Sequence, residues 1–496
     1  MYTFGGSFTR RAACYLARVP DGSLTLEVAV VATLVLASGK REIAAIPGSQ
    51  SISLAEILSA LSFALDLTED AVPGHALRSC LLGMRLGKEL RLDPARMANL
   101  YYALLLKDVG CSSNAARLCQ IIGGGDERRV KAGVKLEDWT QPGKPKASTF
   151  RLLWQTVLPG SGALERAAAI ARIGLTQHRN NKEVITLRCD RGAHILRKLG
   201  LGDVAAEAVR GLDEHWDGSG YPECRRGHDI PIESRILAVA QHLDVFASEQ
   251  GTGKAIEVLR ERSGRWFDPE LVRIASSLHA NYGLWWAALS ETPEHETRRR
   301  VLELAPAEAN RLEAADIDLI CEAFADVVDA KSSFTYRHSM GVTDAAVDIA
   351  RQMGLAPERV RLVHRAALLH DLGKLRVPNS VLDKQGKLDA REWQMVQEHP
   401  RLTREILSRI GQFDELALIA GAHHEKLDGS GYPDRLPAAS LPLEARIVAV
   451  ADVYGALTEN RPYRAGLPLE QVIEIMTKDT PHKLDPDCFE ALMRTI

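Results

Sequence analysis

The sequence predicts an all-α protein made of two tandem helical bundles. Apolar residues recur at three- and four-residue spacing in almost every periodic stretch, which is the repeat of an α-helix. The strict apolar–polar alternation of a half-buried strand is nearly absent. An internal repeat is the third observation, because the turn sequence DGSGYP occurs twice, ending at Pro222 and at Pro433.

Helices account for most of the periodic segments. The first clear pattern begins at Ser53-Leu54 and continues through Leu65. Residues 1–50 precede it and are predicted to be a poorly ordered leader, whose longest apolar run, residues 28–37, is too short to span a bilayer. The same period predicts further helices over residues 95–106, 164–173, 316–328, 342–353 and 360–369.

The repeat extends well beyond the turn. Asp108 and Asp371 lie in similar apolar segments and are 263 residues apart. The tyrosines of the two turns, Tyr221 and Tyr432, are only 211 residues apart. The first copy therefore contains 52 extra residues, which we assign to an insertion at about residues 120–185.

These landmarks divide the chain into four parts. We expect a leader over 1–50, a first copy over 51–290, a linker over 291–313 and a second copy over 314–496. A chain of 496 residues is long enough for two or three domains with cores of their own.

Composition excludes several classes of protein. The net charge of −3 provides no overall basic field, so we expect no DNA partner. The eight cysteines include no CxxC pair, which argues against a zinc–thiolate site and for reduced thiols. We therefore expect a cytoplasmic protein without a membrane partner.

The second copy concentrates nitrogen and oxygen donors that are typical metal ligands. They include no thiolate, so they suit Fe, Mn, Ni, Co or Zn rather than Cu(I). Two pairs of donors are adjacent in sequence, and neighbouring residues on a helix point about 100° apart. Such pairs favour two neighbouring metal ions, or one ion where the backbone leaves the helix. The candidate ligands are His338, His370, Asp371, His399, His423, His424 and Asp452.

At the matching positions the first copy keeps only His75 and Asp108, and the other donors are replaced. Lys107 and Arg188 bring positive charge to places where metal ions would lie, which opposes metal binding. We expect Lys107 to form an internal ion pair with Asp108 or Asp213. The first copy is therefore predicted to be degenerate and regulatory. Its replacements are Lys107 for His370, Cys111 for Lys374, Arg188 for His399, Leu212 and Asp213 for His423 and His424, and Gln241 for Asp452.

The second copy resembles an HD-GYP domain of the HD phosphohydrolase superfamily. The matching motifs occur in family order over residues 336–464, and they are YRHS, HDLGK, VPNSVLDK, EHP, HHEKLDGSGYP, ARIVAVADVY and RPYR. The resemblance implies hydrolysis of a cyclic dinucleotide, chiefly cyclic di-GMP to pGpG or GMP, at a site with two or three metal ions. It also implies that the candidate donors are metal ligands and that Asp371 bridges two ions.

Further roles follow from the same resemblance. Lys374 would contact a phosphoryl oxygen, on the same side as His370 if the helix continues that far. Arg461 and Arg464 would bind the phosphate or the guanine edge, since arginine offers a planar fork of donors. The GYP motif itself is Gly431, Tyr432 and Pro433.

Two departures from the family, and two alternative functions, qualify this interpretation. Phe334 occupies the position of a glutamate that helps some members hold a third ion, so two ions are favoured. Asn460 stands where an aspartate is expected.

One alternative function is hydrolysis of another cyclic dinucleotide or nucleotide. The other is an adaptor that binds partners such as diguanylate cyclases through the GYP surface, and a homodimer is compatible with either.

Overall fold

The computed structural model describes residues 52–69, 72–138, 147–283, 292–306, 312–332, 338–460 and 465–496. Within these ranges the secondary structure is helical, with no strand and only two isolated β-bridges. The predicted all-α class is therefore confirmed. Among the same residues, no helix is long and apolar enough to cross a membrane. The predicted leader, residues 1–50, lies outside the described ranges.

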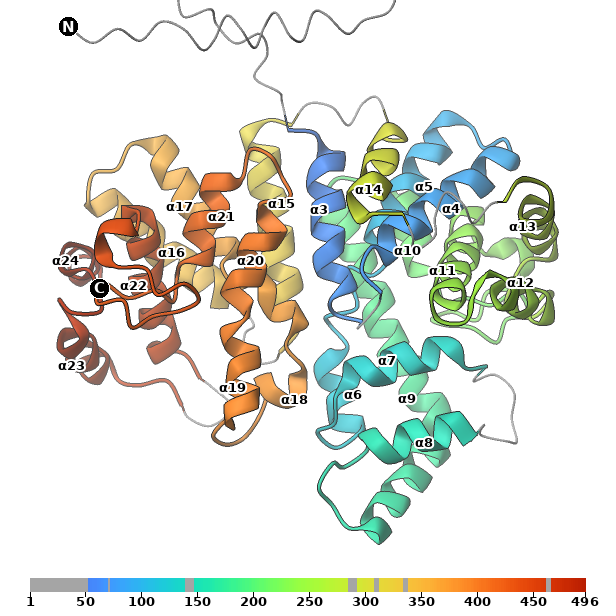
Figure 1. Cartoon of the computed structure of the whole chain (residues 1–496), viewed down its shortest axis with the longest axis horizontal. Helices are drawn as coiled ribbons and strands as arrows, with labels where there is room; N and C mark the ends of the chain where they lie inside the picture. Colours follow the sequence, from blue (N-terminus) through green and yellow to red (C-terminus); the bar gives the residue numbers. More distant parts are fainter. Residues whose placement is uncertain are drawn as a thin grey trace, which may run out of the picture. The chain divides into compact units, whose positions relative to one another are not determined.

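Figure 1 shows the order of the helices along the chain. The first half contains α3 (Leu54–Asp66), α4 (His75–Glu89), α5 (Pro94–Leu106), α6 (Ala115–Ile121), α7 (Glu127–Leu136), α8 (Ala147–Thr156), α9 (Ala163–Lys198), α10 (Gly202–Arg210), η1 (Gly227–Asp229), α11 (Ile232–Gln250), α12 (Thr252–Glu261) and α13 (Pro269–Tyr282). One helix, α14 (Glu294–Glu303), lies within the expected linker. The second half contains α15 (Ala314–Asp329), α16 (His338–Gln352), α17 (Pro357–Leu369), η4 (Leu372–Arg376), α18 (Asn379–Leu382), α19 (Ala390–Gln397), α20 (His399–Leu407), α21 (Asp414–Gly421), η5 (Ala438–Ser440), α22 (Leu443–Thr458), α23 (Leu469–Asp479) and α24 (Pro486–Met493).

Helix α3 begins where the sequence predicts and packs against both halves. Ser53 caps it, because its hydroxyl accepts from the backbone N–H of Glu56 while the Glu56 carboxylate accepts from the N–H of Ser53. Nearly all of its side chains are buried, which requires neighbours on every side. The helix contacts α4 and α5 in the first half and α20 and η4 in the second.

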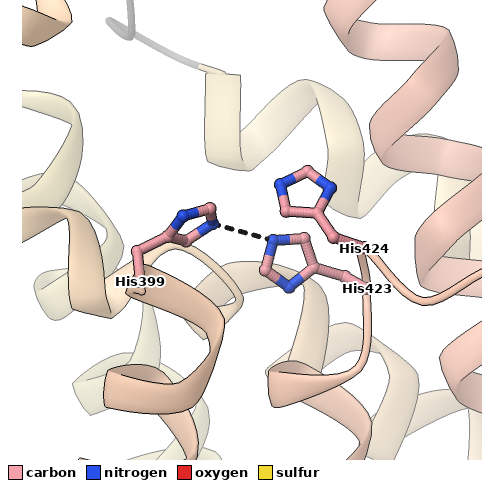
Figure 2. A group of neighbouring side chains, drawn as sticks. All are labelled: His399, His423 and His424. Atoms are coloured by element: carbon pink, nitrogen blue, oxygen red, sulfur yellow. Dashed lines mark hydrogen bonds between the residues drawn. The ribbon is translucent and has the colours of Figure 1, made fainter. Parts of the chain in front are cut away.

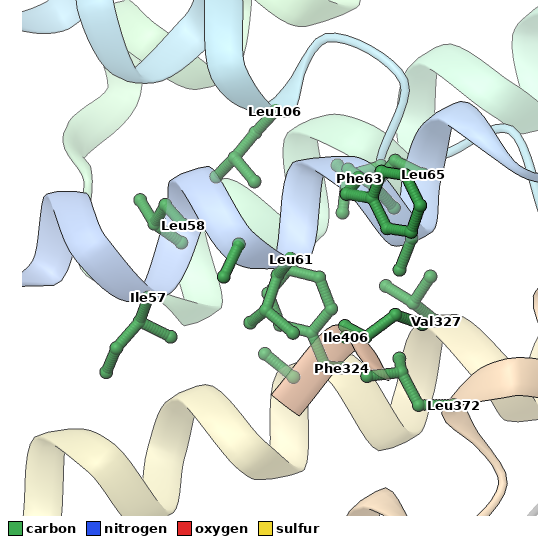
Figure 3. Packing of buried hydrophobic residues seen from close by; sticks show 14 of the residues in the cluster. Ile57, Leu58, Leu61, Phe63, Leu65, Leu106, Phe324, Val327, Leu372 and Ile406 are labelled. Carbon is green, nitrogen blue, oxygen red and sulfur yellow. The ribbon is translucent and has the colours of Figure 1, made fainter. Parts of the chain in front are cut away.

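A single hydrophobic core therefore includes residues of both copies. Figure 3 shows Leu61 of α3 close to Phe324 of α15 and Ile406 of α20, with Leu106 on the opposite side of the helix. All four side chains are almost fully buried. Because the two copies share this core, the second copy is supported by residues far from it in sequence.

The insertion of the first copy is itself helical. It comprises α7, α8 and the N-terminal part of α9, which pack around a small separate apolar cluster of Ile122, Val130 and Val157. The helix predicted over residues 164–173 is only the start of the 36-residue α9.

Both DGSGYP turns are held by an equivalent buried glutamate. The Glu425 carboxylate accepts backbone N–H groups of Asp434 and Leu436, at 2.7 and 2.9 Å. Glu214, 211 residues earlier, accepts in the same way from the N–H groups of Glu223 and Arg225. The turn is therefore built alike in the copy that has all the candidate ligands and in the copy that has lost most of them.

Candidate metal centre

The first pair of adjacent donors lies where a helix ends. Helix α17 stops at Leu369, with His370 as its C-cap, and the chain then forms the 3-10 helix η4. This break lets His370 and Asp371 approach the same point, as the sequence argument allows. It also corrects one expectation, because the α-helix does not continue to Lys374. The Lys374 ammonium instead lies 2.5 Å from Oδ2 of Asp371.

The second pair follows the same rule. Helix α21 ends at Gly421, and His423 and His424 come directly afterwards. Figure 2 shows their rings beside that of His399, which is the first residue of α20. The Nε2 atoms of His399 and His423 are 3.1 Å apart.

Three of the imidazole rings are oriented by a hydrogen bond on the nitrogen that faces away from the centre. Nδ1 of His370 donates to the carbonyl oxygen of Ala367 at 2.6 Å. His399 and His423 do the same with the carbonyls three residues before them, at 2.5 and 2.7 Å. A carbonyl oxygen can only accept, so Nδ1 carries a proton, and the ring in its neutral form presents the Nε2 lone pair to the centre.

The two oxygens of Asp371 face different histidines. Oδ2 lies 3.3 Å from Nε2 of His370 and 3.7 Å from Nε2 of His338. Oδ1 lies 3.2 Å from Nε2 of His399 and 3.9 Å from Nε2 of His423. One buried carboxylate is thus shared between two groups of imidazoles.

Asp452, on α22, completes both groups. Its Oδ1 lies 3.4 Å from Nε2 of His338, and its Oδ2 lies 3.6 Å from Nδ1 of His424. All seven predicted donors are therefore brought together, and all but the partly exposed His424 are buried.

These donors fit a divalent metal ion. An ionised Asp371 can only accept, and Nε2 of His399 and of His423 also present lone pairs. Three acceptor atoms thus converge within 4 Å of one another, and Oδ1 of Asp371 forms no hydrogen bond in the described part of the chain. Buried acceptors that face one another are costly unless a cation lies between them. Nitrogen and carboxylate donors without thiolate are suited to Fe, Mn, Co, Ni or Zn.

Most of the donors are held in the protonation state that binds metal. Burial would raise the pKa of Asp371, but the neighbouring charges of His370 and Lys374 outweigh it and hold that pKa well below its usual value. Burial lowers the pKa of His424 to about 3 and that of His423 well below its usual range. The carboxylate is therefore ionised and these rings are neutral at neutral pH.

Two of the rings, His370 and His338, differ from the others. Burial would lower the pKa of His370, but the Asp371 carboxylate outweighs that effect and raises the pKa. The second ring is His338. Burial lowers its pKa, but the carboxylates of Asp452 and Glu459 outweigh that effect and raise the pKa to about 9. His338 must therefore lose a proton before its Nε2 can bind a metal ion.

Glu459 is a residue of the site that sequence reasoning missed. Its carboxylate lies 2.7 Å from Nδ1 of His338, and this contact directs the other nitrogen of the ring toward Asp371 and Asp452. The signal was its spacing, because Glu459 follows Asp452 by seven residues, or two helical turns.

The other predicted residues lie in different situations. Tyr432 packs on His424, with 4.8 Å between ring centroids, so the GYP motif forms part of the wall of the centre. A Cβ on Gly431 would lie 2.5 Å from Cα of Glu425, which explains the need for glycine there. Phe334, Arg461 and Arg464 lie outside the described residues.

In the first copy, lysine and arginine side chains occupy the corresponding region. The buried Lys107 pairs with Asp108, as expected, whereas Asp213 pairs with Arg188 and not with Lys107. Lys135, from the insertion, lies 3.8 Å from the other oxygen of Asp108. Two ammonium groups therefore face the two oxygens of Asp108, the counterpart of Asp371. Internal cations offset its charge without a metal ion.

Comparison with known proteins assigns the family. A family model described as HD domain matches residues 162–271 and 322–488, more than half of the chain, and the chain belongs to this family. It is an HD-GYP-type phosphohydrolase, which confirms the resemblance in the sequence.

Particular relatives match to different extents. The 3'3'-cGAMP-specific phosphodiesterase 3 of Vibrio cholerae is 39% identical over 449 residues, which cover 89% of this chain and 94% of that protein. The cyclic di-GMP phosphodiesterase response regulator RpfG of Xanthomonas campestris is 46% identical over 148 residues, 29% of this chain and 39% of RpfG. The crystal structure of the cyclic GMP-AMP-specific phosphodiesterase V-cGAP3 of V. cholerae aligns with a TM-score of 0.61 and 36% identity, over 90% of this chain and 97% of that one.

Proposed function

We propose that the second copy, residues 314–496, hydrolyses a cyclic dinucleotide at a centre of two divalent transition metal ions. The observation that carries the proposal is the position of Asp371, whose two oxygens face separate groups of imidazoles. A carboxylate in this position suits a bridge between two ions. One ion would be held by His338, His370, Asp371 and Asp452, and the other by Asp371, His399, His423 and His424.

The protein side chains would supply orientation and charge. When bound, the metal ions would polarise the phosphoryl group and lower the pKa of a water molecule. Lys374 already lies against Asp371 with its side chain 15% exposed, so its ammonium can turn to a phosphoryl oxygen of the substrate. Arg461 and Arg464 are proposed to bind the substrate as well.

We infer that a mixed cyclic GMP–AMP is the preferred substrate, ahead of cyclic di-GMP. The relative that matches across both copies is named for 3'3'-cGAMP, whereas RpfG, named for cyclic di-GMP, matches 29% of this chain. This reverses the order expected from the sequence. Cyclic di-GMP is kept as the second candidate because its named phosphodiesterase has the higher identity over the matched part.

The first copy, residues 51–290, is proposed to be a metal-free regulatory domain, joined to the catalytic one by a linker over 291–313. The support is the replacement of ligands by Lys107 and Arg188, both paired with carboxylates.

Metal content and substrate cleavage test the proposal together. We expect the purified protein to contain about two equivalents of transition metal and to cleave 3'3'-cGAMP faster than cyclic di-GMP. The variants His370→Ala and Asp371→Asn should lose metal and at least about a hundredfold in kcat. The matched control is His364→Ala, which changes a partly exposed histidine of α17, the helix that leads to His370. A wild-type protein with neither metal nor cleavage would refute the proposal, and faster cleavage of cyclic di-GMP would reverse the substrate order.

A further inference from the structure

The segment from His370 to Asn379, here called the HD loop, contains Asp371 and Lys374. Its first half is held by α20 of the second copy. The N–H of Gly373 donates to the Thr403 hydroxyl at 2.9 Å, and that hydroxyl donates to the carbonyl of His370 at 2.9 Å. A Cβ on Gly373 would lie 2.1 Å from the carbonyl oxygen of His399. The first half of the HD loop is thus pressed against α20.

The end of the HD loop is held by the degenerate copy. Both carboxylate oxygens of Glu127, the first residue of α7, lie 3.1 Å from the backbone nitrogen of Asn379 and accept its N–H. Glu127 and Asn379 are both fully buried. The nearby Arg128 guanidinium donates to the carbonyl oxygen of Arg376 at 2.6 Å. Two consecutive residues of the insertion therefore bind the HD loop within five residues of Lys374.

A buried lysine stands opposite the same carboxylate. Nζ of Lys331 lies 3.7 Å from Oε1 of Glu127, and only 1% of the Lys331 side chain is exposed. The carbonyl oxygen of Lys331 accepts from Nδ2 of Asn379 at 2.6 Å. Burying a carboxylate and an ammonium together costs more than an apolar contact would, so packing alone does not account for the pair. What the pair provides is a directional contact to one backbone N–H.

We propose that Glu127 is a positioning residue for catalysis, through which the degenerate copy fixes the HD loop and hence Lys374 and Asp371. The proposal rests on the proposed hydrolytic function of the second copy. Glu127 touches no predicted ligand, and it acts through the backbone of Asn379. A shift of the loop by about 1 Å is enough to cost a large factor in rate.

Two double variants isolate the hydrogen bond from the charge. Glu127→Gln/Lys331→Met and Glu127→Met/Lys331→Met remove the same two charges and replace Glu127 with side chains of similar volume. Only the glutamine offers an oxygen to the Asn379 N–H. We expect the methionine version to have a kcat at least about tenfold below that of the glutamine version, with KM within about twofold. Arg129→Ala, an exposed position on the same helix, should match the wild type.

Hydrogen exchange provides a readout that does not depend on turnover. In the full chain without added metal, the amides of residues 372–379 should exchange faster in the methionine version than in the glutamine version. Equal exchange and equal kcat in the two versions would overturn the proposal. If the wild type cleaves no cyclic dinucleotide, the proposed function fails, and the exchange comparison still decides whether Glu127 holds the HD loop.

Discussion

Each buried imidazole of the centre has one nitrogen engaged away from it. Backbone carbonyls accept from Nδ1 of His370, His399 and His423, and the Glu459 carboxylate contacts Nδ1 of His338. The rings are thus oriented before any metal ion binds, which reduces the cost of assembling the site.

Removing the Glu459 carboxylate should weaken metal binding without removing a ligand. In Glu459→Ala, His338 loses the contact that directs its Nε2, and we expect the metal affinity to fall by about 10- to 100-fold. Titration of the metal-free protein with Mn²⁺ or Zn²⁺ measures this. Glu470→Ala, an exposed glutamate on the next helix, is the control, and equal affinities of the two variants would contradict the role of Glu459.

Lys331 should make stability depend on pH. Burial lowers its pKa from 10.5 to about 8, despite the opposing charge of Glu127. Asp126 also raises this pKa, while Lys131 and Arg128 lower it. Between pH 8 and pH 10.5 the unfolded chain binds one more proton than the folded one, so the free energy of unfolding rises with pH over this window.

This rise in the free energy of unfolding should amount to roughly 3 kcal/mol at most, and it should be missing in Lys331→Met. Urea unfolding at several pH values across the window measures it, as the difference between wild type and variant. That difference cancels the other groups that titrate there. Parallel pH curves for the two proteins would show that Lys331 is not perturbed.

The residue types of the centre could be predicted from the sequence, but their partners could not. Histidine and aspartate are metal donors wherever they occur, so the ordered motifs were enough to select all seven donors that the structure brings together. The role of Glu459 depends on which face of α22 meets His338, and the pairing of Arg188 with Asp213 depends on two distant helices. Such contacts are properties of tertiary packing, and sequence spacing alone gives only a weak signal for them.

At the scale of elements, the same limit applies to helix ends and lengths. The apolar period predicted α17 well, but it gave no sign of the change to a 3-10 helix at Leu372, where Gly373 lies close to the His399 carbonyl. The sequence predicted only the start of α9. The middle part of this helix is largely exposed and carries few apolar residues in phase, so it left no helical pattern in the sequence. Periodicity detects a buried face, and an exposed helix offers none.

Gly373→Ala should separate η4 from α20. The new Cβ would lie 2.1 Å from the His399 carbonyl oxygen, so the backbone must move and the bond from Gly373 to Thr403 is lost. We expect a loss of about 1–3 kcal/mol in unfolding free energy, together with reduced metal content. Denaturant unfolding and metal analysis measure the two effects. Gly386→Ala, where an added Cβ meets nothing within 4 Å, should be neutral, and a similar neutrality at Gly373 would contradict the structure.

At the scale of the whole molecule, the two copies share one hydrophobic core although the repeat predicts two bundles. Sequence similarity between copies reveals that each has the same helices. It carries no information about which faces of the copies meet, because those faces, such as the one around Leu61, read like any other buried pattern.

A shared core predicts that metal bound in one copy stabilises both. Removing metal with a chelator should lower the melting temperature of the full chain, which should still unfold in one cooperative transition. The free energy of unfolding should fall by about 3–4 kcal/mol when the metal was present at 100 to 1,000 times its Kd. In His423→Ala the chelator should have little effect. Calorimetry with and without chelator tests this, and two separate transitions, of which only one moves, would contradict it.

The packing of α3 has a consequence for modularity. Phe324 and Ile406 reach almost zero exposure partly because Leu61 and its neighbours cover them. A fragment that begins at α15 would carry an uncovered apolar face and a loop deprived of Glu127. The second copy is thus not a module that could be moved into another signalling protein without the helices of the first copy.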